Sequence, residues 1–324
     1  MIDLSDIEAA AKRLDGVAVK TPLLQNAELD RVTGGTVLIK PECFQSIGSF
    51  KIRGAYNLMS QLSAEQASRG VVAWSSGNHA QGVALAGKLL GIHAAIVMPE
   101  DAPAAKLRNT RELGGEIITY DRYTEDREAI ARSVAADRGA EIVPSYEDER
   151  IIAGQGTVGL EIAEQCQALG LPVDQALINC GGGGLTSGTA LALKSYYPDA
   201  DVYTVEPEDF DDTARSLAAG ERVAIREGAR SICDALLTDM PGQLTYDIMR
   251  AHVRRGLTVS DAEVREAMRF AFRNLKIVVE PGGAASLAAI LAGKIETAGK
   301  TTVIIFSGGN VDVEQFASIQ TERI

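Results

Sequence analysis

One lysine of this sequence has surroundings that suggest chemistry. The stretch SIGSFKIRGA, residues 46–55, places Lys51 among small residues, an aromatic residue and glycine. A lysine amine has an ordinary pKa of about 10.4, so at neutral pH it is protonated and a poor nucleophile unless its surroundings change that. Most lysines in such a position are solvated side chains at the start of a helix. A chemical role for Lys51 therefore needs support from the rest of the chain.

A run of four glycines, residues 181–184, is the second candidate. It lies in NCGGGGLTSGTALALKSYY, residues 179–197, between a predicted strand and a predicted helix. Such a turn directs several N–H groups at one point near a helix N-terminus, which favours a phosphate site over a simple tight turn. Thr186 stands where a dinucleotide fingerprint needs glycine, and Thr189 where a P-loop needs lysine. The phosphate therefore belongs to another class of ligand.

Two further strand ends carry small polar residues. SSGNHAQG, residues 75–82, follows one predicted strand, and SGGN, residues 307–310, follows another. The first could bind a carboxylate or a phenolic oxygen, although taken alone it is better interpreted as an ordinary helix N-terminus, and SGGN as a glycine turn. Because ligands collect at the carboxyl ends of parallel strands, these ends and the glycine run are suited to one shared ligand.

An acidic stretch, VEPEDFDD, is a possible cation site. Its residues 205–212 follow a predicted strand and include five carboxylates. Carboxylates together with a loop carbonyl can bind Mg²⁺ or Ca²⁺. Spacing alone favours a solvated acidic loop.

The elements that position these residues are those of an α/β protein. Short apolar strands alternate with helical patterns, which indicates parallel sheets covered on both faces. Because no Pro/Gly/Ser-rich linker divides the chain, two domains would be interleaved. The predicted strands are 36–40, 71–75, 93–99, 116–120, 140–144, 175–180, 201–207 and 301–307, and the predicted helices include 82–91, 159–170 and 262–275.

Composition limits the class of protein. The chain has 324 residues, 46% hydrophobic and 23% charged, as in ordinary globular proteins. A net charge of −12 argues against nucleic-acid binding. Four cysteines without a CxxC pair predict reduced, mostly buried thiols and no zinc site. These cysteines are Cys43, Cys166, Cys180 and Cys233.

The N-terminal segment predicts a helix rather than a targeting sequence. Acidic residues interrupt residues 1–16, and Ser5 and Glu8 form a possible capping box. No apolar run approaches the roughly 20 residues of a membrane span. We therefore expect a cytoplasmic protein that does not enter a membrane. The predicted buried face of this helix consists of Ile7, Ala10, Ala11 and Leu14.

Taken in order, the motifs resemble one enzyme family. GSFKIRGA, SSGNHAQG, AGQGT (residues 153–157), GGGGLTSG and SGGN are similar to the motifs of fold-type II pyridoxal phosphate (PLP) enzymes. Among these enzymes, the serine/threonine dehydratase and serine racemase branch is the most similar. The resemblance implies two interleaved domains with open parallel sheets, as in the tryptophan synthase β fold. It assigns residues 1–66 and 147–324 to a large PLP-binding domain and residues 67–146 to a small domain that closes over the substrate.

The resemblance also implies roles for the residues of these motifs. Lys51 resembles the lysine that forms the Schiff base with PLP and then removes the substrate's α-proton, and Phe50 the aromatic residue on the cofactor ring. Asn78 is similar to the partner of the 3′-oxygen, Ser307 to the partner of the pyridine nitrogen, and Glu280 lies near that ring edge. The predicted phosphate loop is Gly181, Gly182, Gly183 and Gly184.

Substrate contacts follow from the same resemblance. Ser76 resembles the serine on the ring face opposite the lysine in racemases, where it is a second acid or base; alternatively it binds the substrate carboxylate. Arg127 aligns with an arginine that reaches a second carboxylate, which favours a dicarboxylic substrate. By composition alone Arg127 would be a surface charge. The implied substrate-binding set is Ser75, Ser76, Gly77, Asn78, His79 and Arg127.

The resemblance changes the interpretation of the acidic stretch. Glu206, the carbonyl of Phe210 and Asp212 are similar to a divalent-cation site of serine racemases and hydroxyaspartate dehydratases, which implies Mg²⁺ or Mn²⁺. Members of the family are usually homodimers. Ser46 and Ile47 depart from the family pattern, as does Trp74, and these differences argue against simple threonine specificity.

The predicted activity is PLP-dependent β-elimination. A β-hydroxy amino acid loses its hydroxyl and amine and gives an oxo or imino acid and ammonia. The favoured substrate is 3-hydroxyaspartate, followed by L-serine and L-threonine. The alternative within the family is a racemase that uses Lys51 and Ser76 as bases on two faces. The alternatives outside it are a nucleotide-dependent oxidoreductase and a non-catalytic binding protein.

Overall fold

The chain folds around two sheets that are interleaved in sequence. The computed structural model describes residues 2–102 and 104–322. A six-stranded sheet has the order β1-β2-β10-β7-β8-β9, and all its neighbours are parallel except β1 and β2. Its strands are β1 (Leu24–Gln25), β2 (Thr36–Pro41), β7 (Gln175–Asn179), β8 (Asp201–Pro207), β9 (Arg255–Val259) and β10 (Thr301–Phe306).

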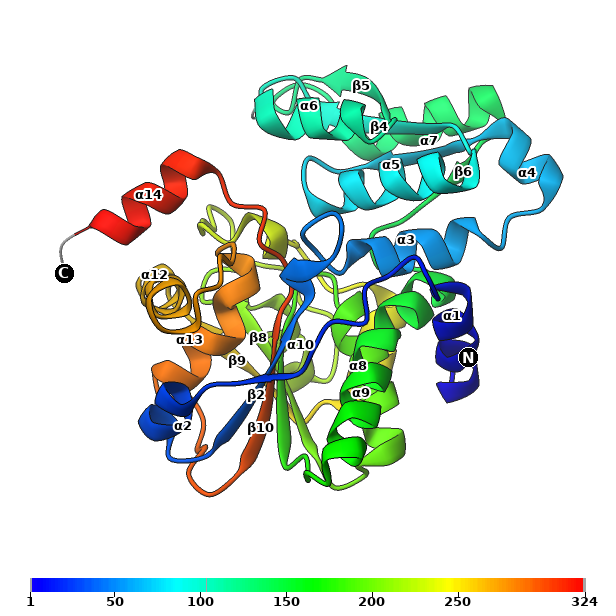
Figure 1. Ribbon diagram of the computed structural model, residues 1–324. Helices are drawn as coiled ribbons and strands as arrows, with labels where there is room; N and C mark the ends of the chain where they lie inside the picture. Colours follow the sequence, from blue (N-terminus) through cyan, green and yellow to red (C-terminus); the bar gives the residue numbers. More distant parts are fainter. Residues whose placement is uncertain (1, 103, 323–324) are drawn as a thin grey trace.

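A four-stranded parallel sheet is formed by one continuous part of the chain between β2 and β7. Its order is β5-β4-β3-β6, and in Figure 1 it lies above the larger sheet, on the side where α4 to α7 are labelled. Its strands are β3 (Val71–Trp74), β4 (Ala94–Pro99), β5 (Glu116–Tyr120) and β6 (Glu141–Ile142).

Helices cover both faces of each sheet, as uninterrupted apolar strands require. In β2, Val37 and Ile39 join the core that contains α12 and α13, whereas Leu38 joins the core that contains α8 and α9. The helices are α1 (Leu4–Arg13), α2 (Ala27–Thr33), α3 (Lys51–Met59), α4 (Ala64–Arg69), α5 (Asn78–Leu90), α6 (Ala104–Glu112), α7 (Arg127–Arg138), α8 (Glu149–Leu169), α9 (Gly184–Tyr196), α10 (Asp212–Ala219), α11 (Gln243–His252), α12 (Asp261–Phe270), α13 (Ala285–Leu291) and α14 (Val313–Thr321), with short helical turns η1 (Glu42–Phe44), η2 (Asp234–Leu236), η3 (Ala271–Leu275) and η4 (Gly282–Ala284).

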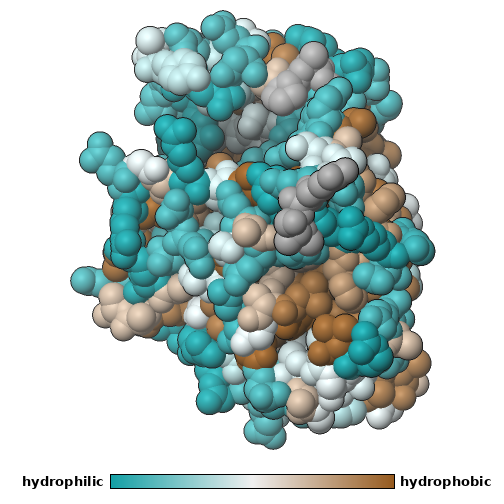
Figure 2. All heavy atoms as spheres, turned by 90° about the vertical axis from the view of Figure 1, so that its left-hand side faces the viewer, coloured by the Kyte–Doolittle hydropathy of each residue, from teal (hydrophilic) through white to brown (hydrophobic). Residues whose placement is uncertain are grey.

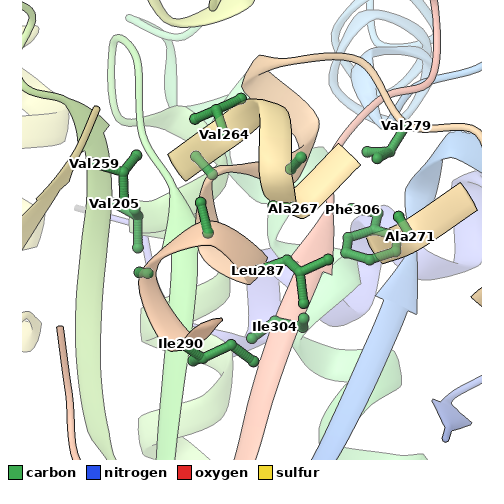
Figure 3. Close-up of a cluster of buried hydrophobic side chains, with 14 of the residues drawn as sticks. Val205, Val259, Val264, Ala267, Ala271, Val279, Leu287, Ile290, Ile304 and Phe306 are labelled. Atoms are coloured by element: carbon green, nitrogen blue, oxygen red, sulfur yellow. The ribbon is translucent and has the colours of Figure 1, made fainter. Parts of the chain in front are cut away.

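The largest hydrophobic core lies between the six-stranded sheet and the helices α12 and α13. Figure 3 shows side chains from these two layers directed toward one another, including Val205 and Ile304 from the strands and Val264 and Leu287 from the helices. On the outer side, the face of α2, α12 and α14 carries hydrophobic surface that gathers in one area (Figure 2). Separately, Phe272, Val278 and Val313 are exposed hydrophobic residues in or next to η3 and α14. Among the residues described, no helix combines the length and apolarity needed to cross a bilayer.

Helix α1 forms where it was predicted, but its cap is different. The carboxylate of Asp3 accepts hydrogen bonds from the N–H groups of Ser5 and Asp6, and the side chain of Asp6 accepts from the N–H of Asp3. The predicted cap by Ser5 and Glu8 is wrong because the helix starts earlier, with Asp3 as its cap. The carboxylate of Asp3 is a stronger hydrogen-bond acceptor than a serine hydroxyl, and its negative charge interacts favourably with the N-terminal end of the helix dipole. Of the predicted buried face, Ile7, Ala10 and Leu14 are buried, and Ala11 is partly exposed.

Most strands form where the apolar runs predict them. The predicted strand 140–144 shortens to β6, and β1 and β9 were not predicted, because a two-residue strand and the sequence RGLTV carry little apolar signal. The prediction of a helix over 159–170 was too short, since α8 begins at Glu149 and includes the AGQGT motif. The predicted helix 262–275 ends in a π-helical turn, η3. All four cysteines are free, and three of them are buried.

Candidate active site

The predicted cofactor and substrate residues line one cavity. It has a volume of about 790 Å³, and residues from both sheets and from the loops that follow them form its wall. The residues predicted from motifs far apart in sequence therefore meet at one place. The predicted residues that line it are Phe50, Lys51, Ser75, Ser76, Gly77, Asn78, His79, Arg127, Gly181, Gly182, Gly183, Gly184, Glu280 and Ser307.

Lys51 is the first residue of α3, and its side chain is directed into the cavity. Its Nζ donates a hydrogen bond to the carbonyl oxygen of Ser145 at 3.1 Å and lies 5.2 Å from the centre of the Phe50 ring. Burial lowers the pKa of Lys51 to about 8, and the charge of Glu280 opposes this shift only in part. A lysine with this pKa is a far better nucleophile or base at neutral pH than a solvated one.

A buried ion cluster behind Lys51 fixes the start of α3. Arg53 binds both carboxylate oxygens of Glu42, at 2.7 and 2.9 Å, and also pairs with Glu161 at 2.6 Å. Lys40 pairs with Glu161 at 2.6 Å, and the side chains of Arg53, Glu42 and Lys40 are at most 1% exposed. Such a cluster joins α3 to β2, η1 and α8, so the position of Lys51 is determined by its neighbours on three sides.

The four-glycine loop connects β7 to the N-terminus of α9. Gly183 has a φ of +91°, which favours glycine. A Cβ at Gly182 would overlap the ring of Tyr146, and one at Gly184 would overlap the side chain of Gln155. The loop therefore consists of glycine because other side chains already occupy the space beside it. Its N–H groups lie at the end of a 13-residue helix, where an anion is favoured.

Asn179, the last residue of β7, holds Ser307 at the end of β10. Its Nδ2 shares two hydrogens among three acceptors, which are the carbonyl oxygens of Gly283 at 2.9 Å and Ile305 at 3.0 Å and Oγ of Ser307 at 3.2 Å. The Oδ1 of Asn179 accepts a hydrogen bond from the N–H of Ser286 at 2.7 Å. Because Ser307 accepts from Asn179, its own O–H is free to donate toward the cavity. This suits a ring nitrogen that carries no proton.

Asn78, the first residue of α5, joins the two parts of the wall. Its Nδ2 donates to Oε1 of Glu280 at 2.7 Å, and its Oδ1 accepts from Nδ2 of Asn310 at 2.7 Å. Burial and the nearby Asp234 raise the pKa of Glu280 to about 7, although the hydrogen bond from Asn78 opposes the shift.

His79 is a structural rather than a titrating residue. Its Nε2 lies 2.8 Å from the carbonyl oxygen of Val143 and is therefore the protonated nitrogen. Burial, together with the charge of Lys51, lowers the pKa of His79 to about 3, so the ring is neutral near pH 7. Ser75 accepts a hydrogen bond from the N–H of Gly77 at 3.2 Å, and Ser76 remains partly exposed to the cavity.

Arg127 lies at the start of α7 and lines the cavity. Its guanidinium makes no hydrogen bond or ion pair with any other residue that the structure describes. The other two arginines of α7 are paired, Arg132 with Glu128 and Arg138 with Glu116. Arg127 is thus the arginine of this helix that remains available to an anionic ligand.

The acidic stretch after β8 is not a solvated loop throughout. Glu208 and Asp209 are exposed, but Glu206, Phe210 and Asp212 are buried. The interpretation from spacing alone is wrong for the two buried carboxylates, because β8 ends and α10 begins inside the fold. These residues do not line the cavity. Within the described chain, no cluster of three or more His, Cys, Asp or Glu side chains could hold a metal ion.

Many other lining residues were not predicted, among them Tyr146, Gln155 and Asn310. Tyr146 and Gln155 pack against the glycine loop, and Asn310 binds Asn78. Gln155 and Asn310 belong to motifs that the sequence analysis quoted, AGQGT and SGGN, so their motifs could have indicated them. Tyr146 lies in a stretch without a motif.

The chain is similar to known enzymes over nearly its whole length. Residues 15–308 match the family described as pyridoxal-phosphate dependent enzyme. The chain is 47% identical over 314 residues to the L-threo-3-hydroxyaspartate ammonia-lyase of Pseudomonas sp., covering 97% of each chain. It is 42% identical to the serine racemase of Schizosaccharomyces pombe, over 96% of this chain and 95% of the racemase. The structure of maize serine racemase superposes with a TM-score of 0.92 at 39% identity, covering 98% of this chain and 96% of that one.

Proposed function

This chain belongs to the family of pyridoxal-phosphate dependent enzymes, and from that premise we propose that it is an ammonia-lyase acting on β-hydroxy amino acids. The observation that carries the proposal is the position of Lys51, a lysine with a lowered pKa in the same cavity as a glycine loop at a helix N-terminus. An aldehyde cofactor with a phosphate group needs both features. The absence of a dinucleotide fingerprint argues against the oxidoreductase alternative.

The residues of the cavity fit PLP. Lys51 would hold the aldehyde carbon, the loop of residues 181–184 the phosphate, Asn78 the 3′-oxygen and Ser307 the ring nitrogen, with Phe50 and Glu280 beside the ring. The N–H groups of this loop, at the N-terminus of α9 and in the same cavity as Lys51, match a cradle for the phosphate. When bound, PLP withdraws electrons from Cα of an amino acid, which makes the bonds at that carbon easier to break.

The protein's own residues would move the protons. Once the amine of the substrate has replaced it at the aldehyde carbon, the freed amine of Lys51 would take the proton from Cα as a general base, and a pKa of about 8 suits this role near neutral pH. The C–O bond at Cβ would then break, and the hydroxyl would leave as water with the proton that Lys51 took from Cα. The resulting enamine becomes an imine, which water hydrolyses to an oxo acid and ammonia. Ser75, Gly77 and His79 shape the wall on which the substrate carboxylate would bind.

The favoured substrate is 3-hydroxyaspartate, followed by L-serine and L-threonine. Arg127 supports the dicarboxylic substrate because its guanidinium lines the cavity without a partner among the described residues. An arginine can bind a carboxylate through two parallel hydrogen bonds. From 3-hydroxyaspartate the products would be oxaloacetate and ammonia. The similarity to the Pseudomonas sp. enzyme supports the same choice.

A substrate panel tests this function. Ammonia release is measured with L- and D-serine, L-threonine and the four isomers of 3-hydroxyaspartate, each with and without EDTA. We expect the highest kcat/KM with one 3-hydroxyaspartate isomer. In parallel, borohydride reduction and peptide mapping should find a pyridoxyl group on Lys51. A reduced protein without this adduct would overturn the proposal.

Racemisation of serine is the second candidate. Ser76 and Lys51 line the same cavity, and a racemase needs one acid or base on each face of Cα. The similarity to serine racemases supports this activity as well. Conversion of L-serine to D-serine, measured by chiral chromatography, should depend on both residues. S76A should abolish racemisation and retain ammonia release if Ser76 acts only on the second face.

We also propose a Mg²⁺ or Mn²⁺ site formed by Glu206, the carbonyl of Phe210 and Asp212. The side-chain oxygen Oδ2 of Asp212 is buried without a hydrogen-bond partner, and Glu206 and Asp212 repel each other when both are ionised. A divalent cation would satisfy the free oxygen and cancel this repulsion. EDTA should lower the melting temperature of the wild type and leave that of D212N unchanged, measured by scanning calorimetry with and without added Mg²⁺.

The remaining proposals concern the organisation of the enzyme. Residues 1–66 and 147–324 would form the large PLP-binding domain, and residues 67–146, which contain all four strands of the smaller sheet, the domain that closes over the substrate. An ion pair of 2.6 Å joins Lys106 to Asp234 across the two parts.

We further propose that the enzyme is a homodimer, which the hydrophobic area in Figure 2 supports. We also propose that it is cytoplasmic, with which its free cysteines are consistent.

A further inference from the structure

Asn310, the last residue of the SGGN motif, uses both hydrogens of its side-chain amide within the protein. Its Nδ2 donates to the carbonyl oxygen of Ile47 at 2.7 Å and to Oδ1 of Asn78 at 2.7 Å. A carbonyl oxygen can only accept, so the first of these bonds determines which way round the amide of Asn310 lies. The second bond then determines the orientation of the amide of Asn78.

The backbone around Asn310 keeps this amide in place. Gly309 donates its N–H to the carbonyl oxygen of Gly48 at 2.9 Å, and Gly308 forms a β-bridge with Ser49. Gly48 has a φ of +73°, and a Cβ there would overlap Oδ1 of Asn310. The loop that leads to Lys51 and the loop after β10 thus fit closely around the amide of Asn310.

The orientation of Asn78 has a chemical consequence. Its Nδ2 donates one hydrogen to Oε1 of Glu280 at 2.7 Å, and no described residue accepts the other. Gly308 packs against the hydrogen bond between Asn78 and Glu280, since a Cβ at Gly308 would overlap the carboxylate of Glu280. Asn78 lines the cavity. If its amide were reversed, Oδ1 rather than an N–H would face Glu280 and the cavity.

We propose that Asn310 is a positioning residue that keeps the amide of Asn78 in the orientation that offers an N–H to the 3′-oxygen of PLP. This inference rests on the proposed function, because it assigns that oxygen as the partner of Asn78. Asn310 also lines the cavity, but both hydrogens of its side-chain amide are used within the protein, so this amide acts on the cofactor through Asn78. The hydrogen bond matters because a phenolic oxygen carries negative charge, and an N–H stabilises that charge whereas a carbonyl oxygen repels it.

A double-mutant cycle tests the proposal. PLP affinity is measured for the wild type and for N78A, N310A and N78A/N310A, by titration of the PLP-free proteins. We expect each single substitution to weaken PLP binding about tenfold, which corresponds to one hydrogen bond to a charged group. The double variant should bind PLP no more weakly than N78A, because Asn310 acts only through Asn78. The visible absorbance of bound PLP changes with pH, and the midpoint of this change should shift from its wild-type value by the same amount in all three variants.

Stability separates the positioning role from a structural one. The melting temperature of the PLP-free protein should still fall when N310A is added to N78A, since the bond to Ile47 is lost there too, and it should fall further when N310A is made in the wild type, which also loses the bond to Asn78. If N310A does not fold, N310D replaces it, because aspartate has the same shape and cannot donate. N274A, a substitution of an exposed asparagine, is the matched control and should bind PLP as the wild type does.

Two results would overturn the inference. The first is an unchanged PLP affinity in N310A or N310D, and the second is a loss of affinity that is equally large in the N78A background. Failure of the proposed function gives a different result, because the wild type would then show no pyridoxyl adduct on Lys51 after borohydride reduction. If the wild type carries that adduct but the effects of N78A and N310A on PLP affinity are additive, the role of Asn310 is refuted and the proposed function is not.

Discussion

The amine of Lys51 and the carbonyl oxygen of Ser145 lie 3.1 Å apart and form a hydrogen bond. Ser145 lies in the connection from β6 to α8, so the chain that returns from the four-stranded sheet contacts the reactive amine directly. Gln155 donates to the same oxygen at 3.2 Å. The carbonyl of Ser145 thus links the amine to Gln155, whose side chain lies against Gly184 of the glycine loop.

The lowered pKa of Lys51 predicts how fast PLP attaches at different pH values. Only the neutral amine attacks an aldehyde, so below its pKa of about 8 the rate should rise about tenfold per pH unit and then become constant. Stopped-flow absorbance after mixing PLP with PLP-free protein measures this rate. A rate that still rises above pH 9 would contradict the prediction. In E280Q the midpoint should move to lower pH, because Glu280 stabilises the protonated amine.

Removing Arg127 should change substrate preference. R127M should lower kcat/KM for 3-hydroxyaspartate about tenfold to a hundredfold, the effect of losing a charged hydrogen bond, and leave L-serine unaffected. Ammonia release with the two substrates provides the comparison. R138M is the matched control, since Arg138 lies on the same helix and pairs with Glu116. Equal losses for both substrates would indicate a structural role for Arg127.

Neighbouring glycines of the phosphate loop should differ in tolerance. In G182A the new Cβ would overlap the ring of Tyr146, which should cost about 1–3 kcal/mol of stability and weaken PLP binding. In G181A the nearest atom is Oγ1 of Thr238 at 3.2 Å, so the change should be small. Urea unfolding and PLP titration measure both effects. Adding Y146A to G182A should restore PLP affinity if the overlap is the cause.

The buried ion cluster should contribute to stability far more than an exposed pair does. R53M leaves Glu42 buried without its partner and should lower the free energy of unfolding by about 3–5 kcal/mol. R31M, which breaks an exposed pair with Glu28, should cost less than about 1 kcal/mol. Urea unfolding of the two variants beside the wild type measures the difference. Similar values for both would show that the cluster is not desolvated.

Sequence predicted the positions of the cavity residues better than their contacts. The glycine loop was predicted because a glycine turn between strand and helix suits a phosphate, and Lys51 because its motif resembles that of a known enzyme family. Asn310 was quoted within its motif, but its role depends on Ile47 and Asn78, which are distant in sequence. The contact between the ring of Tyr146 and Gly182 could not be predicted, because Tyr146 lies in a stretch without a motif and only the fold brings it to the glycine loop.

The dependence of exposure and pairing on the whole fold also explains the errors in the predictions for other parts of the chain. Spacing alone could not show that Glu206 and Asp212 are buried, because exposure depends on how α10 packs against β8 and β9. The edge strand β9 was missed because its solvent-facing residues interrupt the apolar signal. The strands between it and β2 were predicted because burial on both faces makes them apolar throughout.

The pairing of β2 with β10 determines when the enzyme becomes complete during its synthesis. Thr36 pairs with Thr301, whereas the four-stranded sheet uses one continuous stretch of chain. On the ribosome the smaller sheet can therefore fold while the larger one still lacks its central strand, because long-range pairings form late. Since Ser307 and Asn310 come after β10, the cavity cannot be complete before this strand has been synthesised.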